Sequence, residues 1–180
     1  MLEIRIPPTE LWDDTSEEFI NVNKEVVLSL EHSLVSISKW ESIWHKPFLA
    51  KFPKKTTEEV ISYIRCMTLT KNVDPKVYYA IPATEMAKIN AYIEDPMSAR
   101  KPSSGKKSAR EVITSELIYY WMIAYNIPPE YRKWHLNRLL SLIELCGIKN
   151  TPPKKISAME KYSKYKALNE ARRAAWKTRG

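Results

Sequence analysis

The sequence predicts an α+β fold that is mostly helical, with a small antiparallel sheet at its start and a basic helix at its end. Apolar residues recur at spacings of three and four from residue 31 onward, which is the period of a helix with one buried face. The first 30 residues instead alternate with a period of two, as strands do. Three glycines in 180 residues argue against an all-β fold rich in tight turns. We expect one globular domain over residues 1–148, with strands over 1–30 and a helical bundle over 31–147, followed by a basic linker and helix over 149–180.

The strand signals fall in two places. Residues 2–6, LEIRI, alternate apolar and charged side chains and end at two prolines. An acidic loop should follow through residue 18. Residues 19–30 read as a hairpin with its turn near Asn23-Lys24. A hairpin alone is marginal in water, so this sheet of two or three strands should pack on the helices.

Four helix signals come next along the chain. The first is an apolar stripe ending at Pro47, formed by Leu34, Ile37, Trp40 and Trp44. Thr56 with Glu59 three residues later is a capping box, which predicts a helix start. Asp74-Pro75 predicts a short helical turn through Tyr79. Thr84 should cap another helix, whose inward residues are predicted to be Ala87, Ile89, Tyr92 and Ile93.

Residues 110–147 predict the central feature, two amphipathic helices joined at Pro128-Pro129. Gly147 stands where a left-handed C-cap is wanted. The first helix should bury a stripe formed by Ile113, Leu117, Tyr120, Trp121 and Ala124. The second helix should bury a stripe formed by Leu136, Leu139, Leu140, Ile143 and Cys146.

Three consecutive aromatic residues, Tyr119, Tyr120 and Trp121, cannot all lie on one face of a helix, since neighbours are about 100° apart. A large aromatic core that includes the Trp40/Trp44 helix is the favoured interpretation. An apolar docking surface for a partner helix is the second. The same two interpretations, a core position or a docking surface, apply to Tyr131 and Trp134.

Charge is distributed unevenly along the chain, whose formal net charge is +8. Residues 149–180 hold ten Lys and Arg against two Glu, whereas the first 31 residues hold eight acidic residues against two basic ones. Another basic stretch, residues 95–110, has the composition of a loop. This asymmetry favours charged partners or head-to-tail contact between copies.

The basic tail interleaves cations with aromatic residues. Its cations include Lys161, Lys164, Arg172 and Arg173, and Tyr162, Tyr165, Leu168 and Trp176 lie among them. A solvated helix opened by Ser157 and Glu160 is the favoured interpretation. Binding of an acidic protein segment comes second, and binding of nucleic acid comes third.

No catalytic, metal or cofactor signature is present in the sequence. The three histidines, His32, His45 and His135, are dispersed, and Cys66 and Cys146 lack partners at metal-binding spacing. Both cysteines are expected to be reduced core residues. The chain has no phosphate-binding loop or nucleophile elbow, so we do not expect an enzyme. It shows no signal peptide and no long apolar run, which predicts a protein of the cytoplasm.

Several stretches resemble a family of tailed-phage proteins described as tail assembly chaperones. They lie over most of the chain: LEIRIPPTELWD at the start, LEHSLVSISKWESIWHKPFL at 30–49, TTEEVISYIRCMTLT at 56–70, ITSELIYYWMIAYNIP with KWHLNRLLSLIELCGIKNTPPKK within 113–155, and ALNEARR at 167–173.

The resemblance implies a non-structural protein that is made in the infected host cell and is absent from the finished virion. Such chaperones coat the helical tape-measure protein and keep it soluble until tail-tube subunits polymerise around it. In many phages a translational frameshift adds an extension that recruits the tail-tube protein. The resemblance supplies no binding residues.

From the residues themselves we expect an aromatic centre whose edge meets partner helices, and a basic electrostatic handle. A homo-oligomer is possible in this scheme. The alternative function is a nucleic-acid-associated protein or a structural connector of the virion. The expected aromatic centre comprises Trp40, Trp44, Tyr119, Tyr120, Trp121 and Trp134, and the expected handle comprises Lys161, Lys164, Arg172 and Arg173.

Overall fold

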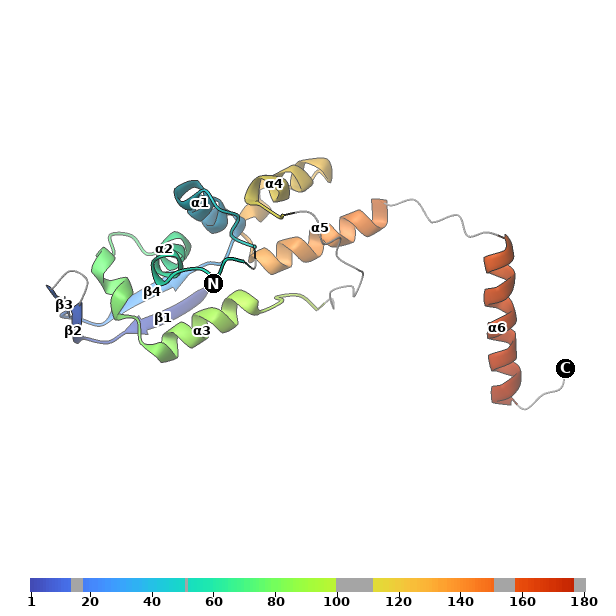
Figure 1. Cartoon of the computed structure of the whole chain (residues 1–180), viewed down its shortest axis with the longest axis horizontal. Helices are drawn as coiled ribbons and strands as arrows, with labels where there is room; N and C mark the ends of the chain where they lie inside the picture. Colours follow the sequence, from blue (N-terminus) through green and yellow to red (C-terminus); the bar gives the residue numbers. More distant parts are fainter. Residues whose placement is uncertain (14–17, 51, 100–111, 151–157, 177–180) are drawn as a thin grey trace. The chain divides into compact units, whose positions relative to one another are not determined.

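The computed structural model describes residues 1–13, 18–50, 52–99, 112–150 and 158–176 (Figure 1). The chain divides into two compact units, Met1–Gly147 and Ile148–Gly180. The elements in order are β1 Leu2–Ile6, β2 Thr9–Asp13, β3 Glu18–Val22, β4 Val26–Leu30, α1 Leu34–Trp44, α2 Thr57–Met67, the 3-10 helix η1 Pro75–Ala80, α3 Ala83–Glu94, α4 Ser115–Ala124, the 3-10 helix η2 Pro129–Lys133, α5 Leu136–Asn150 and α6 Ala158–Trp176. The predicted fold class, α+β and mostly helical, is confirmed.

The four strands form two antiparallel pairs, β1 with β4 and β2 with β3. The predicted strand over residues 2–6 is confirmed as β1. The predicted hairpin within residues 19–30 is wrong, because β3 and β4 each pair with a strand from before the turn. Strand β2 lies where a loop was expected. The observed register opposes Ile4 to Leu28, which places the apolar residues of β1 and β4 on one shared face.

That shared face forms one side of the hydrophobic core. Its four central side chains are fully buried, and the edge of β4 continues into the segment after α2. There the nitrogen of Glu31 donates to the carbonyl of Met67 at 2.9 Å, and the nitrogen of Leu69 donates to the carbonyl of Ser29 at 2.8 Å. These bonds fix the end of α2 to the sheet. The four buried side chains are those of Ile4, Ile6, Leu28 and Leu30.

Helices α1 and α2 both begin at capping boxes. Thr56 and Glu59 form the predicted one, with the Thr56 nitrogen 2.8 Å from Glu59 Oε2. Helix α1 is capped by Ser33, whose side chain and that of Ser36 exchange hydrogen bonds with each other's backbone. The predicted stripe of α1 is confirmed, since Leu34, Ile37 and Trp40 are buried and Trp44 packs against them.

The predicted turn after Asp74 is confirmed as η1, in which the Asp74 side chain accepts a hydrogen bond from the Lys76 nitrogen at 2.9 Å. The predicted cap of α3 is wrong. Pro82 is the N-cap, and its extended backbone starts the helix two residues earlier than predicted, so Thr84 falls within the first turn. Of the predicted inward residues, Ile89 and Tyr92 are buried and Ile93 packs against the core, but Ala87 is exposed.

The predicted central pair of helices is present as α4 and α5, but η2 lies between them, and α4 packs against α1. The buried residues of α4 are Ser115, Ile118 and Met122, so the predicted stripe is wrong: Tyr120 and Ala124 are exposed. Helix α4 is apolar nearly all round, so its sequence period does not define one inner face. The stripe of α5 is confirmed, with Leu136, Leu139 and Ile143 buried and Leu140 and Cys146 packed beside them.

Gly147 is not a C-cap, because α5 continues through it to Asn150. A Cβ atom at Gly147 would lie 3.2 Å from the hydroxyl oxygen of Tyr125, which follows the last residue of α4. The glycine therefore allows the Tyr125 ring to approach the α5 backbone. The predicted loop over residues 95–110 is confirmed at residues 95–99, which follow the end of α3 and are not helical, whereas its residues 100–110 and the cap at Ser157 lie outside the described residues.

Candidate partner-binding surface

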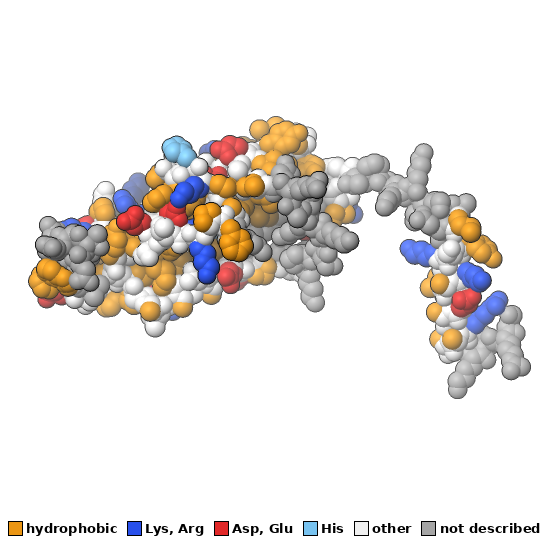
Figure 2. Space-filling view, viewed as in Figure 1, with side chains coloured by type: hydrophobic (Ala, Val, Ile, Leu, Met, Phe, Trp, Pro, Cys, Tyr) orange, Lys and Arg blue, Asp and Glu red, His pale blue; other side chains and the backbone are white. Residues whose placement is uncertain are grey.

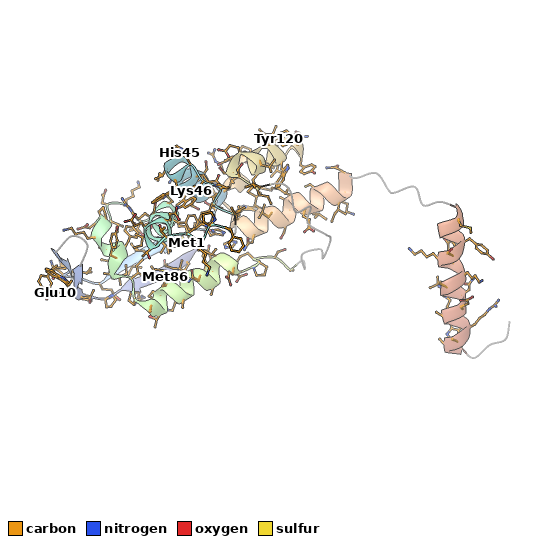
Figure 3. All side chains as sticks on the ribbon, viewed as in Figure 1. Met1, Glu10, His45, Lys46, Met86 and Tyr120 are labelled. Carbon is orange, nitrogen blue, oxygen red and sulfur yellow. The ribbon has the colours of Figure 1, made fainter. Side chains whose placement is uncertain are left out.

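Helix α4 presents large apolar side chains to solvent. Tyr120 is 63% exposed and Ile123 is 76% exposed, although both belong to a helix whose other face is in the core. Their spacing of three places them side by side, together with the exposed Glu116 and Ala124. We call these four residues the α4 outer face. Figure 2 shows apolar atoms gathered over α4, and Figure 3 labels Tyr120 on it.

A buried carboxylate fixes the start of α4. Glu41 of α1 accepts a hydrogen bond from the Ser115 nitrogen with one oxygen and from the Phe48 nitrogen with the other, each at 2.8 Å. Thr114 caps the same end through its side chain. A negative charge at a helix N-terminus is stabilising, because the first backbone N–H groups have no partner within the helix.

The C-terminal end of α4 is also held in place by specific contacts. The nitrogen of Ile127 donates to the carbonyl of Met122 at 2.8 Å, and Asn126 adopts a left-handed conformation with φ of 51°. Tyr125 rests against the backbone of α5 at Gly147. With both ends fixed and Ile118 fully buried, α4 cannot rotate to hide its outer face.

Two residues of the expected aromatic centre face α2 instead of α4. Trp40 is only 1% exposed, and its Nε1 donates to the carbonyl of Glu59 at 2.8 Å. Trp44 stacks on Trp40 with ring centroids 6.2 Å apart and donates to the hydroxyl of Ser62. Trp40 is therefore a core residue, and Trp44 links α1 to α2 through its hydrogen bond to Ser62.

The remaining residues of that set lie on α4 and beside η2. Tyr119, Trp121 and Trp134 are partly buried, and burial raises the pKa of Tyr119. Trp134 stacks on Tyr131 with ring centroids 3.9 Å apart, and the Arg138 guanidinium lies 4.1 Å from the Trp134 centroid. Among the six expected residues Tyr120 is the one that is mostly exposed, and Ile123 joins it although the sequence pattern did not single it out.

The expected electrostatic handle lies on α6. Lys164, Arg172 and Arg173 are exposed, while the Lys161 side chain lies outside the described residues. Tyr162, Tyr165 and Trp176 on the same helix are also exposed. Helix α6 therefore displays cations and aromatic rings together.

A buried polar cluster lies where the segments that precede α1 and α5 meet α2 and α3. His32 Nδ1 is hydrogen-bonded to the Tyr63 hydroxyl, and the His32 ring meets the His135 ring edge-on at 5.0 Å. His135 Nε2 donates to the Tyr92 carbonyl at 2.9 Å, and its Nδ1 has no partner. Burial, assisted by His135, lowers the pKa of His32 to about 3, and burial also lowers the pKa of His135. Both rings are therefore neutral core groups at neutral pH.

A groove of about 610 Å³ runs beside the C-terminal halves of α1 and α2. Its lining includes Lys39, Arg65 and Cys66 but neither a carboxylate nor a histidine. Burial raises the pKa of the Cys66 thiol, which is the reverse of what an activated nucleophile needs. The groove thus lacks the imidazole and carboxylate groups that most often act as general acids and bases.

Across the described part of the chain, no three His, Cys, Asp or Glu side chains are grouped so that they could hold a metal ion. Within the same ranges, every helix is too short or too polar to cross a membrane. Comparisons of the chain with family models, with curated proteins and with solved structures give no match.

Proposed function

We propose that this chain is a non-catalytic assembly chaperone of a tailed phage. It binds the helical tape-measure protein in the host cytoplasm, keeps it soluble while tail-tube protein assembles, and is absent from the finished virion. Two things support this proposal: the resemblance of the sequence to that family, and the exposed apolar side chains of the α4 outer face. The second is the observation that carries the argument.

The α4 outer face suits a helical partner. Tyr120 and Ile123 stand one turn apart, so they can contact the apolar stripe of another helix in the manner of helix-to-groove recognition. Burying apolar surface contributes about 25 cal/mol per Å², so contact through these two side chains is weak for a single copy. Many copies along one filament would gain avidity and could still be displaced one at a time.

Co-expression with the tape-measure protein tests the proposal. The wild-type chain should raise the soluble fraction of the tape-measure protein and co-purify with it. A double variant, Tyr120→Glu with Ile123→Glu, should lose both effects because it places charge on the α4 outer face. Tyr79→Glu, which changes an exposed tyrosine on η1, is the matched control and should behave as wild type. No gain in solubility with the wild-type chain would refute the function.

The exposed cations and aromatic rings of α6 favour one second candidate, a nucleic-acid-associated protein. Lysine and arginine contacts to phosphate give affinity that falls steeply with salt, and aromatic rings can stack on bases. Binding to DNA that weakens with salt and disappears on deleting residues 156–180 would support this alternative.

A further inference from the structure

Helix α6 carries an aromatic face flanked by cations. Tyr162, Tyr165 and Arg173 line one shallow hollow of about 250 Å³, with Lys166, Asn169 and Glu170. Trp176 falls on the same side, since it lies 14 residues after Tyr162 and 11 residues after Tyr165, and both spacings are close to whole turns of a helix. Among the described residues of α6, every side chain is exposed. This face has the composition of a docking surface without a partner.

The β2–β3 ribbon carries a second exposed aromatic group. Trp12 and Phe19 are directly opposite each other across the strands, their rings pack edge to face at 4.8 Å, and both are more than half exposed. Glu10, which Figure 3 labels, lies two residues before Trp12, and alternate residues of a strand lie on the same side of the ribbon. Neither edge of the ribbon pairs with another described strand. The outer side of the ribbon is thus aromatic and acidic.

The two surfaces have complementary chemistry. The ribbon belongs to the first 31 residues, which hold eight acidic residues against two basic ones, and α6 belongs to residues 149–180, which hold ten basic residues against two acidic ones. Arginine next to aromatic rings can pair with a carboxylate and lie over a second ring in the same contact. Opposite charge also accelerates encounter between the surfaces.

We propose that α6 of one copy docks on the β2–β3 ribbon of a second copy, so that the chain associates head to tail with itself. Within the first unit, the ribbon and the end of α5 at Gly147 lie at opposite ends (Figure 1). The ribbon of a second copy is the occupant indicated by the opposite charges of the two surfaces and by the exposed aromatic rings on each.

The contact is heterologous, since it joins two different surfaces. A dimer joined by one such contact leaves the ribbon of one copy and the α6 of the other unused, so repetition yields a ring if the rotation closes and an open chain if it does not. This inference concerns the purified chain alone and does not rest on the proposed function.

Sedimentation or light scattering of the full chain tests the proposal. The mean mass should rise with protein concentration and fall with added salt, because opposite charges are screened. Two variants each remove one side of the contact: Arg172→Glu with Arg173→Glu on α6, and Trp12→Ala with Phe19→Ala on the ribbon. Each variant alone should associate at least about tenfold more weakly than the wild type.

Mixing the two variants gives the decisive result. The α6 variant retains its ribbon and the ribbon variant retains its α6, so an equimolar mixture should form a dimer that does not grow further. An isologous contact of α6 with α6, or of ribbon with ribbon, would leave one of the two variants as strongly associated as the wild type, and docking of α6 within one chain would leave the wild-type mass independent of concentration. Either outcome overturns the proposal. If the ribbon variant loses its native circular dichroism, Glu10→Lys replaces it, and combining it with Arg173→Glu should restore association.

Discussion

The carboxylate of Glu41 on α1 accepts a hydrogen bond at 2.8 Å from the backbone nitrogen of Ser115, the first residue of α4, 74 residues further along the chain. Its second oxygen accepts a hydrogen bond from the backbone nitrogen of Phe48 at the same distance, and the side chain is buried. One carboxylate therefore connects α1, the segment after it and the start of α4. This connection determines which face of α4 is exposed.

Glu41→Gln should destabilise the fold by about 1–3 kcal/mol, because the amide of glutamine replaces one of two acceptors and leaves a buried N–H without a partner. Chemical denaturation of the variant and the wild type would measure the loss. Glu58→Gln, which changes an exposed glutamate in the first turn of α2, is the control and should stay within about 0.5 kcal/mol of wild type. Equal stability of the two variants would show that Glu41 does not hold α4.

The two faces of α4 should respond oppositely to mutation. Ile118→Ala removes a fully buried side chain and should cost roughly 2–5 kcal/mol of unfolding free energy. Tyr120→Ser changes an exposed side chain and should cost less than about 0.5 kcal/mol. Thermal melts of the pair would distinguish the observed orientation from the stripe that the sequence pattern predicts. A large loss for Tyr120→Ser with none for Ile118→Ala would contradict the observed orientation.

Features that depend on neighbouring residues could be predicted from the sequence. The capping box of Thr56 and Glu59 and the start of η1 at Asp74 need only residues two or three positions apart. The stripe of α1 could also be predicted, because Leu34, Ile37 and Trp40 recur at helical spacing and are buried together.

Features that depend on distant contacts could not be predicted. The pairing of β1 with β4 excludes the local hairpin because it buries both apolar sets on one face. The start of α4 is held by Glu41, 74 residues earlier in the sequence, and apolar residues lie on nearly every side of α4. The exposure of Ile123 follows from the orientation of α4, so no local signal could have identified it.

Gly147 and Tyr125 should be energetically coupled. Alanine is a better helix former than glycine by about 1 kcal/mol, but a Cβ at Gly147 would lie 3.2 Å from the Tyr125 hydroxyl oxygen. Gly147→Ala should therefore give little or no stabilisation in the wild type and should stabilise by about 0.5–1 kcal/mol when Tyr125→Phe removes the hydroxyl. A double-mutant cycle of denaturation curves measures this difference. Equal effects of Gly147→Ala in both backgrounds would show that the contact is unimportant.

The paired histidines of the core should make stability depend on pH. The Ser33 and His135 backbones form an isolated β-bridge, and the Leu136 nitrogen donates to the His32 carbonyl at 2.8 Å, so the pair lies where the start of α5 meets the start of α1. Both rings are almost wholly buried. Protonating either ring places a charge between these elements.

The folded-state pKa of His32 is about 3, below its ordinary value of 6.5, so the unfolded chain binds more protons between these values. The contribution of neutral His32 is complete above pH 6.5 and is lost as pH falls toward 3, at roughly 1.4 kcal/mol per pH unit. His135, whose pKa is also lowered, should add to the slope. Denaturation at several pH values should show this loss, and His32→Gln should reduce it, whereas His45→Asn at the exposed α1 C-cap should not. An unchanged slope in His32→Gln would exclude His32 as its source.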